Sequence, residues 1–379
     1  MSGVAWDSDP VVAAWSGLPP LTGDRSADAV VVGLGASGLT AVAELADRGL
    51  SVVGVDAGRV AAGAAGRNGG FLLAGPQEPL HRAIELWGED AAVALYRATL
   101  DELDALAPLR VGSIRLAGLP GTSESEAEDD DRARELEDCK LQADAMRAYG
   151  FAVEDHEGPL GSGLYFPRDA ATNPARRAIT MAAELRGRAN LYERTRVRSV
   201  RPREVVTERG VISAPAIVVA VDGRLDSLVP ALAPRVQTAR LQMLATAPIK
   251  PGRLPCPVYG RWGYDYAQQS DDGRLFVGGG RDRFIEQEWT HLAEPSEPVQ
   301  SYVSHVAGRM AGEPVAVTHR WAASVGFTAD GRPLCTLVDD GVVAVGGYNG
   351  TGNLVGPVAA RAAVAYVLDG VVPPAYLAS

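Results

Sequence analysis

The 379-residue sequence is poor in cysteine and lysine, and these shortages exclude several classes of protein. Its three cysteines, Cys139, Cys256 and Cys335, lie far apart and form no CxxC pair. This spacing argues against a disulfide framework or a structural zinc site and predicts a reducing, cytoplasmic setting. Lysine occurs only at Lys140 and Lys250, and the formal net charge is −11. Nucleic acid is not an expected partner, because it binds clustered lysine and arginine.

The sequence also lacks long apolar runs and metal-binding histidine patterns. Its five histidines show no HxxxH or related spacing, so we predict no metal site. No run of roughly 18 apolar residues is free of charge, so we predict no membrane span. The first residues contain an early acid and no basic segment, so we expect no secretory signal. The remaining composition, 46% hydrophobic and 22% charged, is that of a globular chain, long enough for two domains.

The strongest positive signal is the segment "AVVVGLGASGLTAVAELADRGLSVVGVD", residues 29–56. The apolar run Ala29 to Val32 predicts a buried parallel strand, and the helical spacing of apolar residues from Leu39 to Arg48 predicts a helix. Leu50 to Val55 then predicts a second buried strand. A strand–helix–strand unit of this length is typical of a parallel sheet.

The turn between the first strand and the helix, Gly33-Leu34-Gly35-Ala36-Ser37-Gly38, fits GxGxxG. Gly33 permits the sharp turn, Gly35 lets a diphosphate approach the backbone, and Gly38 lets helix and strand pack closely. The helix N-terminus supplies N–H groups and partial positive charge for the phosphates. Asp56, at the end of the second strand, is placed to accept hydrogen bonds from ribose hydroxyls. The pattern predicts a dinucleotide site.

The rest of the chain favours FAD over NAD. Residues 76–150 show mainly helical periodicity, and buried parallel-type strands return only near residues 217 and 342, the latter followed by a glycine-rich turn and a helix starting near Pro357. A nucleotide domain assembled from both ends of the chain is typical of large flavoproteins. Residues 235–325 alternate strand and turn signals. We therefore predict an α/β fold (α+β overall), with a Rossmann-like FAD-binding domain and a substrate domain on a mixed or antiparallel sheet.

A series of motifs in order gives a specific resemblance. After the nucleotide motif come "AAGRNGG", "ATNPARRAITMAAEL", "LYERTRVRSV", "ISAPAIVVAVDG", "HRWAASVGFTADGRPL" and "GGYNGTGNLVGPVAAR". The chain resembles the D-amino-acid oxidase (DAO) superfamily of FAD enzymes, and within it the γ-glutamylputrescine-oxidase-like branch. The resemblance implies an N-terminal arm (1–27), an FAD-binding domain (28–80, 165–228 and 320–379) and a substrate-binding domain (81–164 and 229–319).

The resemblance also implies which residues approach the flavin. The glycine-rich stretch 63–70 would pass beside the diphosphate and the flavin ring, and the N–H groups of the turn 347–352 would face the ring where negative charge develops. The backbone of Val197 would hold the adenine. Non-covalent FAD is expected, because the attachment cysteine and histidine of relatives have no counterpart. The expected cofactor contacts are Gly33, Gly35, Ala36, Ser37, Gly38, Asp56, Ala57, Gly66, Arg67, Asn68, Gly69, Gly70, Val197, Ala220, Gly347, Tyr348, Asn349, Gly350, Thr351 and Gly352.

Relatives that oxidise amino acids hold the substrate carboxylate with an arginine at two places, which read "WAAS" and "YNGTG" in this sequence and contain no arginine, although Arg320 and Arg332 are near in sequence. This favours an amine without an α-carboxylate, oxidised at its CH–NH bond by hydride transfer to flavin N5. The resulting imine would hydrolyse to an aldehyde, with O2 reduced to H2O2. An aromatic set could line the pocket: Tyr259, Trp262, Tyr264, Tyr266 and Trp321. The residues expected around the reacting centre are Arg67, Asn68, Tyr264, Trp321 and Asn349.

Three alternatives remain open at this stage. An amino-acid oxidase would use Arg67, Arg281 or Arg320 as its carboxylate clamp, and a flavin-binding protein without turnover would have no substrate. The electron acceptor is also open, because Phe276 stands where oxygen-reactive relatives carry a lysine. A dehydrogenase that passes electrons to another carrier therefore stays open.

Overall fold

The computed structural model of the chain describes residues 3–378, so the first two residues of the predicted arm lie outside the described residues. The chain forms two compact units. The parallel-sheet unit comprises Trp6–Arg67, Asn173–Ala239 and residues 324–378, and the mixed-sheet unit comprises residues 3–5, Asn68–Thr172 and Arg240–Ala323. That the first binds the cofactor and the second the substrate, with the domain bounds expected above, stays a prediction.

The parallel-sheet unit is built on a six-stranded sheet in the order β19-β20-β13-β2-β3-β9. All its neighbouring pairs are parallel except β19–β20. The predicted strands at residues 29–32 and 50–55 are present, and every residue of β2, β3 and β13 is buried. The strands are β2 (Ala29–Val32), β3 (Val52–Val55), β9 (Asn190–Tyr192), β13 (Ala216–Val219), β19 (Leu334–Asp339) and β20 (Val342–Gly346).

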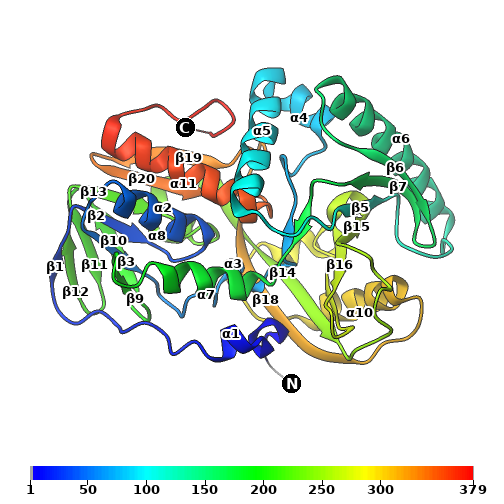
Figure 1. Cartoon of the computed structure of the whole chain (residues 1–379), viewed down its shortest axis with the longest axis horizontal. Helices are drawn as coiled ribbons and strands as arrows, with labels where there is room; N and C mark the ends of the chain where they lie inside the picture. The colour runs from blue at the N-terminus through cyan, green and yellow to red at the C-terminus, as the bar shows by residue number, and fades with distance from the viewer. Residues whose placement is uncertain (1–2, 379) are drawn as a thin grey trace. The chain divides into compact units, whose positions relative to one another are not determined.

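Each face of this sheet is covered. Helices α2 (Ala36–Asp47) and α11 (Gly352–Asp369) lie side by side in Figure 1, drawn in blue and red beside the six-stranded sheet. The alternate residues Val30 and Val32 belong instead to a core with Val205 and Ile212. Those two come from a four-stranded sheet of β1 (Arg25–Ser26), β10 (Val197–Arg201), β11 (Glu204–Thr207) and β12 (Gly210–Ser213). The period of two along β2 therefore supplies apolar side chains to both layers.

Helix α11 corrects one expectation. It starts at Gly352, so Pro357 lies inside the helix rather than at its first turn. Proline has no N–H to donate to the carbonyl of Asn353, four residues before it. In the structure Nη1 of Arg177 donates to that carbonyl at 2.8 Å. Arg177 belongs to α7 (Pro174–Glu184), so a side chain from another helix makes the hydrogen bond that the proline removes.

The mixed-sheet unit contains an eight-stranded sheet in the order β18-β14-β17-β16-β15-β5-β7-β6 and a short β4–β8 pair. The predicted second sheet is present, and the pair β5–β15 within it is parallel. The first residues of β14, up to Ala239, and the last residues of β18, from Ser324 on, belong to the parallel-sheet unit. The strands are β4 (Phe71–Leu72), β5 (Ser113–Leu116), β6 (Glu154–Gly158), β7 (Gly161–Phe166), β8 (Ala170–Ala171), β14 (Val236–Thr246), β15 (Val258–Gly260), β16 (Asp265–Gln269), β17 (Leu275–Gly278) and β18 (Val317–Thr328).

The helices predicted between residues 76 and 150 are present. They are α4 (Leu80–Trp87), α5 (Glu89–Leu106) and α6 (Glu126–Ala148). Gly88, at φ +84°, separates the first two, and the Ser125 side chain caps the third by accepting from the Glu128 N–H. A further helix, α10 (Glu297–Ala311), lies in the region where strands and turns were expected. Its buried residues Val299, Val303, Val306 and Met310 pack on the sheet core.

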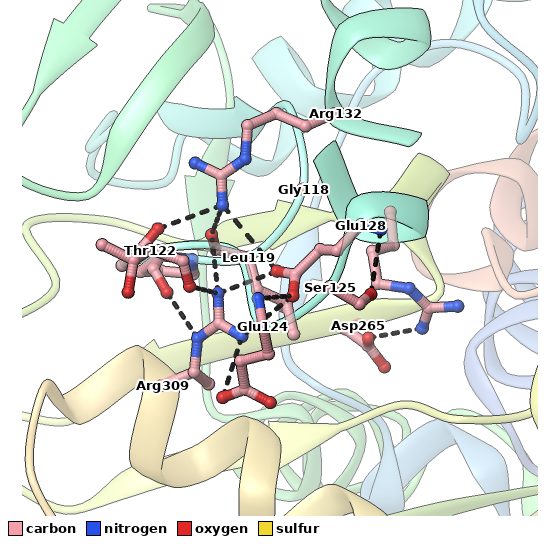
Figure 2. A network of polar contacts seen from close by, with 12 residues as sticks. Gly118, Leu119, Thr122, Glu124, Ser125, Glu128, Arg132, Asp265 and Arg309 are labelled. Atoms are coloured by element: carbon pink, nitrogen blue, oxygen red, sulfur yellow. Dashed lines mark hydrogen bonds and ion pairs between the residues drawn. The ribbon is translucent and has the colours of Figure 1, made fainter. Parts of the chain in front are cut away.

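Two arginines fasten the loop that joins β5 to α6. Figure 2 shows Arg132 of α6 and Arg309 of α10 reaching the carbonyls of this loop from two sides. Arg132 donates to the carbonyl of Leu119 at 3.0 Å, and Arg309 donates to that of Thr122 at 3.1 Å. Arg309 also pairs with Glu128 at 2.8 Å. These bonds hold the helices α6 and α10 to the same loop.

Within residues 3–378 no helix has the length and apolarity that crossing a membrane would require. The three cysteines are buried and unbonded. The same part of the chain brings no three His, Cys, Asp or Glu side chains together as a metal site would need.

A buried carboxyl group makes the stability of the mixed-sheet unit depend on pH. Asp169 accepts from the Ser113 hydroxyl at 2.7 Å and from the Ala74 N–H at 3.1 Å. Burial, partly offset by these bonds and by Arg110, raises its pKa from 3.8 to about 7. Because the folded state binds this proton more tightly, its stabilising effect is complete below pH 3.8 and is lost as pH rises through 7.

We expect Asp169→Asn, which cannot ionise, to avoid this loss. The free energy of unfolding of the variant relative to wild type should increase from pH 5 to 7, by up to about 1.4 kcal/mol per pH unit. Urea unfolding at several pH values measures the difference. The pKa of the buried Asp222 is also raised, to about 6, but its titration occurs in both proteins and cancels from the difference. A difference that does not change with pH would contradict the expected titration of Asp169.

The hydrogen bond between Arg177 and the Asn353 carbonyl yields a second prediction. Arg177→Leu should lower the free energy of unfolding by about 1–3 kcal/mol, because it removes a donor from a partly buried carbonyl. In a Pro357→Ala background the restored backbone N–H serves that carbonyl, so the same substitution should cost less. A double-mutant cycle by urea unfolding measures the coupling. Additive effects would show that Arg177 does not compensate for Pro357.

Candidate functional site

The candidate residues of the parallel-sheet unit gather at one edge of its sheet. Gly33 follows β2, Asp56 follows β3, Ala220 follows β13 and Gly347 follows β20. Because these strands are parallel, their carboxyl ends meet at the same edge, where open α/β sheets bind ligands. The register continues past the strands: the Ala220 N–H donates to the Val32 carbonyl at 2.8 Å.

Two of the three motif glycines are required by the fold itself. Gly33 has φ +98°, and a Cβ there would lie 2.5 Å from the Ala220 carbonyl oxygen. A Cβ on Gly38 would lie 1.8 Å from the Gly33 carbonyl oxygen. Both distances are far shorter than any contact, so an alanine at either position would displace the backbone.

Gly35 is different, because nothing in the fold demands a glycine there. Its φ is −82°, and the nearest atom to an added Cβ is the Cβ of Ala65 at 3.4 Å, an ordinary contact. Gly35 is also the N-cap of α2, and no side chain caps the helix. The first N–H groups of α2, beginning with those of Ala36 and Ser37, are thus not capped by the side chain at the N-cap position and are placed to donate to an anion.

Asp56 is held by the backbone on both sides. One carboxylate oxygen accepts from the Leu34 N–H and the other from the Gly58 N–H, both at 2.8 Å. Its pKa is raised by burial, and the carboxylate of Glu193 adds to this effect. The Leu34 bond ties the carboxylate to the glycine turn, and each oxygen keeps a further lone pair for a hydroxyl group.

The glycine-rich stretch reaches the same turn. Ala61 has φ +69°, and a Cβ on Gly66 would lie 2.2 Å from the Ala61 carbonyl oxygen, so the segment folds tightly on itself. The short helix α3 (Ala64–Arg67) follows, and its Ala65 faces Gly35. Arg67 is half-buried, and burial lowers the pKa of its guanidinium. Ala57 lies in the turn directly after Asp56.

The distal turn, residues 347–352, is fixed by Asn349. This residue has φ +53°, its Nδ2 donates to the Gly347 carbonyl at 2.8 Å and the Gly331 carbonyl at 2.9 Å, and its Oδ1 accepts from the Thr328 N–H at 2.9 Å. The Asn349 side chain is buried and occupied by these bonds. Its expected part in catalysis would accordingly be to shape the turn that continues through Tyr348, Gly350, Thr351 and Gly352.

Sequence reasoning missed Asp222, whose carboxylate also forms hydrogen bonds with this turn. Its carboxylate accepts from the N–H groups of Gly326 at 3.2 Å and Tyr348 at 3.3 Å. Burial raises its pKa to about 6, although the bonds from the surrounding N–H groups lower it. The signal was present, because Asp222 closes the apolar run "AIVVAVD" much as Asp56 closes "LSVVGVD".

Val197 lies at the start of β10, in the four-stranded sheet of the same unit. The other candidates, Asn68, Gly69, Gly70, Tyr264 and Trp321, belong to the mixed-sheet unit.

Within the mixed-sheet unit, Asn68 and its neighbours form a tight turn. The Asn68 Oδ1 accepts from the Gly70 N–H at 2.7 Å, and the amide of Gln268 donates to the Gly69 carbonyl. A Cβ on Gly69 would lie 3.0 Å from the ring of Tyr266. The turn therefore depends on close approach to β16, whereas its expected approach to the flavin stays a prediction.

The predicted aromatic set divides into core and candidate pocket residues. Tyr266 is held between Gly69 and Gly278, and Tyr259 packs against the core around α5 and α6. Both serve packing. Trp321 is 3% exposed and meets Phe276 edge-on, with ring centroids 6.3 Å apart. Tyr264 lies under the guanidinium of Arg281, 6.0 Å from its ring centroid.

The chain matches known proteins over most of its length. Residues 28–366 match the family model described as DAO, FAD dependent oxidoreductase. A probable oxidoreductase OrdL of Rhizobium meliloti (strain 1021) is 29% identical over 359 residues, covering 88% of this chain and 81% of that protein. A gamma-glutamylputrescine oxidoreductase of Escherichia coli (strain K12) is 26% identical over 359 residues, covering 86% and 80%.

Solved structures show the same fold. Glycine oxidase from Geobacillus kaustophilus has a TM-score of 0.67 and 21% identity, covering 91% of this chain and 95% of that one. An L-amino acid deaminase from Proteus vulgaris has a TM-score of 0.69 and 18% identity, covering 97% and 95%. The predicted resemblance and fold class are thereby confirmed, and so is FAD as the cofactor.

The different surroundings of Gly35 and Gly38 separate binding from folding. We expect Gly35→Ala to leave the unfolding midpoint of the FAD-free protein nearly unchanged, because its Cβ has room, yet to weaken FAD binding by about tenfold or more, since the methyl group occupies the anion's place. Gly38→Ala should instead destabilise the FAD-free protein. Thermal unfolding and FAD titration followed by flavin fluorescence measure the two effects. Equal FAD affinity in Gly35→Ala and wild type would argue against diphosphate binding at this turn.

Proposed function

The chain belongs to the DAO family of FAD-dependent oxidoreductases, and we propose that it oxidises the CH–NH bond of a small primary or secondary alkylamine, polyamine-like in character. When bound, FAD supplies the acceptor for a hydride from the α-carbon of the amine. The substrate leaves as an imine, which water hydrolyses to an aldehyde, and O2 is reduced to H2O2. A small-molecule amine and O2 are the proposed partners, with another electron carrier as the alternative to O2.

The strand edge of the parallel-sheet unit supports the cofactor half of this proposal. The turn 33–38 offers the α2 N–H groups to the diphosphate, and Asp56 offers its remaining lone pairs to the ribose hydroxyls. The turn 347–352 precedes α11 with no side chain capping that helix. Its N–H groups and the helix dipole would favour negative charge on the bound ring. None of these contacts requires a covalent bond to the protein.

The observation that favours an amine over an amino acid is the state of Arg320. Its Nη1 donates to the Gln300 side chain at 2.9 Å, to the Gln300 carbonyl at 3.2 Å and to Ser304 at 3.2 Å. The arginine nearest in sequence to Trp321 is thus committed to α10. This argues against Arg320 as the carboxylate clamp of an amino-acid oxidase.

The proposed roles at the reacting centre follow from chemistry that the side chains can perform. Trp321 and Tyr264 would orient an alkyl chain and attract a cationic amine beyond the reacting carbon. Arg67 would bind phosphate or line the cavity, and Asn68 would present the Gly69–Gly70 turn to the ring. No general base is proposed, because orienting a neutral amine for hydride transfer needs none.

A second candidate function, oxidation of an amino acid, is favoured by Arg281. Its guanidinium lies over two aromatic rings, 6.0 Å from the centroid of Tyr264 and 5.4 Å from that of Trp289. Burial lowers its pKa, with Tyr264, Asp282 and Glu288 partly offsetting the effect. A planar guanidinium that lies over aromatic rings is well suited to bind a carboxylate.

Anaerobic substrate addition distinguishes these proposals. We expect alkylamines and polyamines to bleach the flavin absorbance of the purified holoenzyme, and amino acids to bleach it at least about tenfold more slowly, because Arg320 donates to α10 and not to a substrate carboxylate. Stopped-flow spectroscopy measures both rates. Readmitting air then shows whether O2 restores the absorbance and forms H2O2.

Arg281→Met provides the matched control, since it keeps the stem and removes the carboxylate-binding fork. Faster bleaching by amino acids, abolished in Arg281→Met, would replace the first proposal with the second. Failure of both classes to bleach the flavin would overturn the proposal of amine or amino-acid oxidation.

A further inference from the structure

The N-terminal strap, which we define as residues 10–22, crosses the parallel-sheet unit before β1 begins. In Figure 1 it is the dark-blue chain that runs from α1 (Pro10–Ala13) past α7 towards β1. The proposed function assigns it no part. Nevertheless, its polar contacts concentrate on the residues that follow β3 and β9, close to Asp56.

Glu193, directly after β9, joins the strap to the chain after β3. One of its carboxylate oxygens, Oε1, accepts both from the indole N–H of Trp15 at 3.0 Å and from the backbone N–H of Val60 at 2.9 Å. Glu193 is completely buried. Burying a carboxylate costs free energy. The hydrogen bonds that Glu193 accepts from Trp15 and Val60 are therefore needed to stabilise it in this position.

The other oxygen, Oε2, is sealed by the strap itself. A Cβ on Gly17, which has φ +81°, would lie 2.9 Å from this oxygen. Among residues 3–378 the Oε2 atom has no hydrogen-bond partner. Glu193 also acts on Asp56 through space, since its charge helps to raise the Asp56 pKa. The two carboxylates thus lie near each other at the strand edge.

Further bonds tie the strap to the same place. The guanidinium of Arg59 donates to the Val12 carbonyl at 2.9 Å, and that of Arg194 donates to the Leu18 carbonyl at 2.9 Å. The Leu21 N–H donates to the Thr195 hydroxyl at 3.0 Å. Each partner lies in residues 56–60 or 193–195.

These two segments are in turn bonded to each other. The Thr195 N–H donates to the Asp56 carbonyl at 2.8 Å, and the Arg194 N–H donates to the Gly58 carbonyl at 2.9 Å. Gly58 itself donates to the Asp56 carboxylate. A displacement of the strap would therefore be passed on to the backbone that orients Asp56.

We propose that the N-terminal strap fixes the adenosine end of the cofactor site, with Glu193 as the positioning residue that couples it to Asp56. This inference rests on the proposed binding of FAD at the strand edge. Through its Oε1, Glu193 joins Val60 of the segment 56–60 to Trp15 of the strap. Affinity for the adenosine diphosphate half of FAD depends on these contacts of the strap with Glu193 and with residues 56–60.

The test measures cofactor affinity in the full-length protein after FAD has been removed. Glu193→Ala should raise the Kd for FAD by about tenfold, as expected when a hydrogen-bonded charged group is lost. Trp15→Phe, which keeps an aromatic ring beside Arg186, should raise it by a smaller factor. Glu193→Gln should restore affinity, because its amide oxygen still accepts from Trp15 and Val60. ADP, used as a probe of the adenosine half alone, should lose the same factor as FAD.

Two controls separate positioning from general stability. Val303→Ala truncates a fully buried residue of α10 in the other unit and provides a comparable loss of Tm. Arg48→Gln removes a surface pair with Asp369, 2.6 Å away, elsewhere in the parallel-sheet unit. Both should leave the Kd for ADP unchanged, whereas Glu193→Ala should raise it even after Tm is matched.

The outcomes distinguish this inference from the proposed function. If wild type binds neither FAD nor ADP, binding at the strand edge is wrong. If wild type binds both, and Glu193→Ala and Trp15→Phe bind them as tightly, the strap plays no part and only this inference fails. A loss of affinity that merely follows Tm, as in Val303→Ala, would likewise overturn it.

Discussion

The fit of α2 against β2 at Gly38 is the contact on which the rest of the nucleotide site depends. A side chain there would overlap the Gly33 carbonyl, so the helix reaches its position only because Gly38 has none. Once α2 is seated, its N-terminus points along the strand edge and Gly35 presents bare backbone. The lack of a side chain at Gly38 allows the turn to form. The lack of a side chain at Gly35 leaves room for an anion beside the turn.

Buried acids at strand ends recur as the means by which loops are held at this edge. Asp56 accepts from the N–H groups of Leu34 and Gly58, and Asp222 accepts from those of Gly326 and Tyr348. Glu193 accepts from Val60 and the Trp15 indole. All three carboxylates are desolvated. Asp56 and Asp222 accept hydrogen bonds on both oxygens, which is the condition under which a buried charge is tolerated, whereas Glu193 accepts on Oε1 and its Oε2 has no partner among residues 3–378.

The sequence predicted the elements with local signals and failed where long-range contacts decide. The strand–helix–strand unit, the GxGxxG turn and the helices α4 to α6 were all predicted, because periodicity and glycine placement are local. Helix α10 was missed, although its residues Val299, Val303 and Val306 have helical spacing, because turn signals surround it. The start of α11 was misplaced because a proline within a helix most often occupies its first turn. Only the hydrogen bond from Arg177 to the Asn353 carbonyl shows how the interior of α11 accommodates Pro357.

The candidate site divides along the same line. The sequence alone determined the family, the cofactor and the glycine turn, because the motifs are local and occur in a fixed order. The steric exclusion that requires glycine at Gly33 and Gly38 is visible only in the structure. Only the tertiary structure decided that Asn349 is occupied in shaping its turn, that Arg320 is committed to α10, and that Glu193 joins the N-terminal strap to the strand edge. In a sequence, an arginine that binds a ligand cannot be told from one that donates to a carbonyl 20 residues away, nor a glutamate that binds a ligand from one that accepts from an indole N–H 178 residues away. The role of each residue is set by the partners that folding brings within hydrogen-bonding distance.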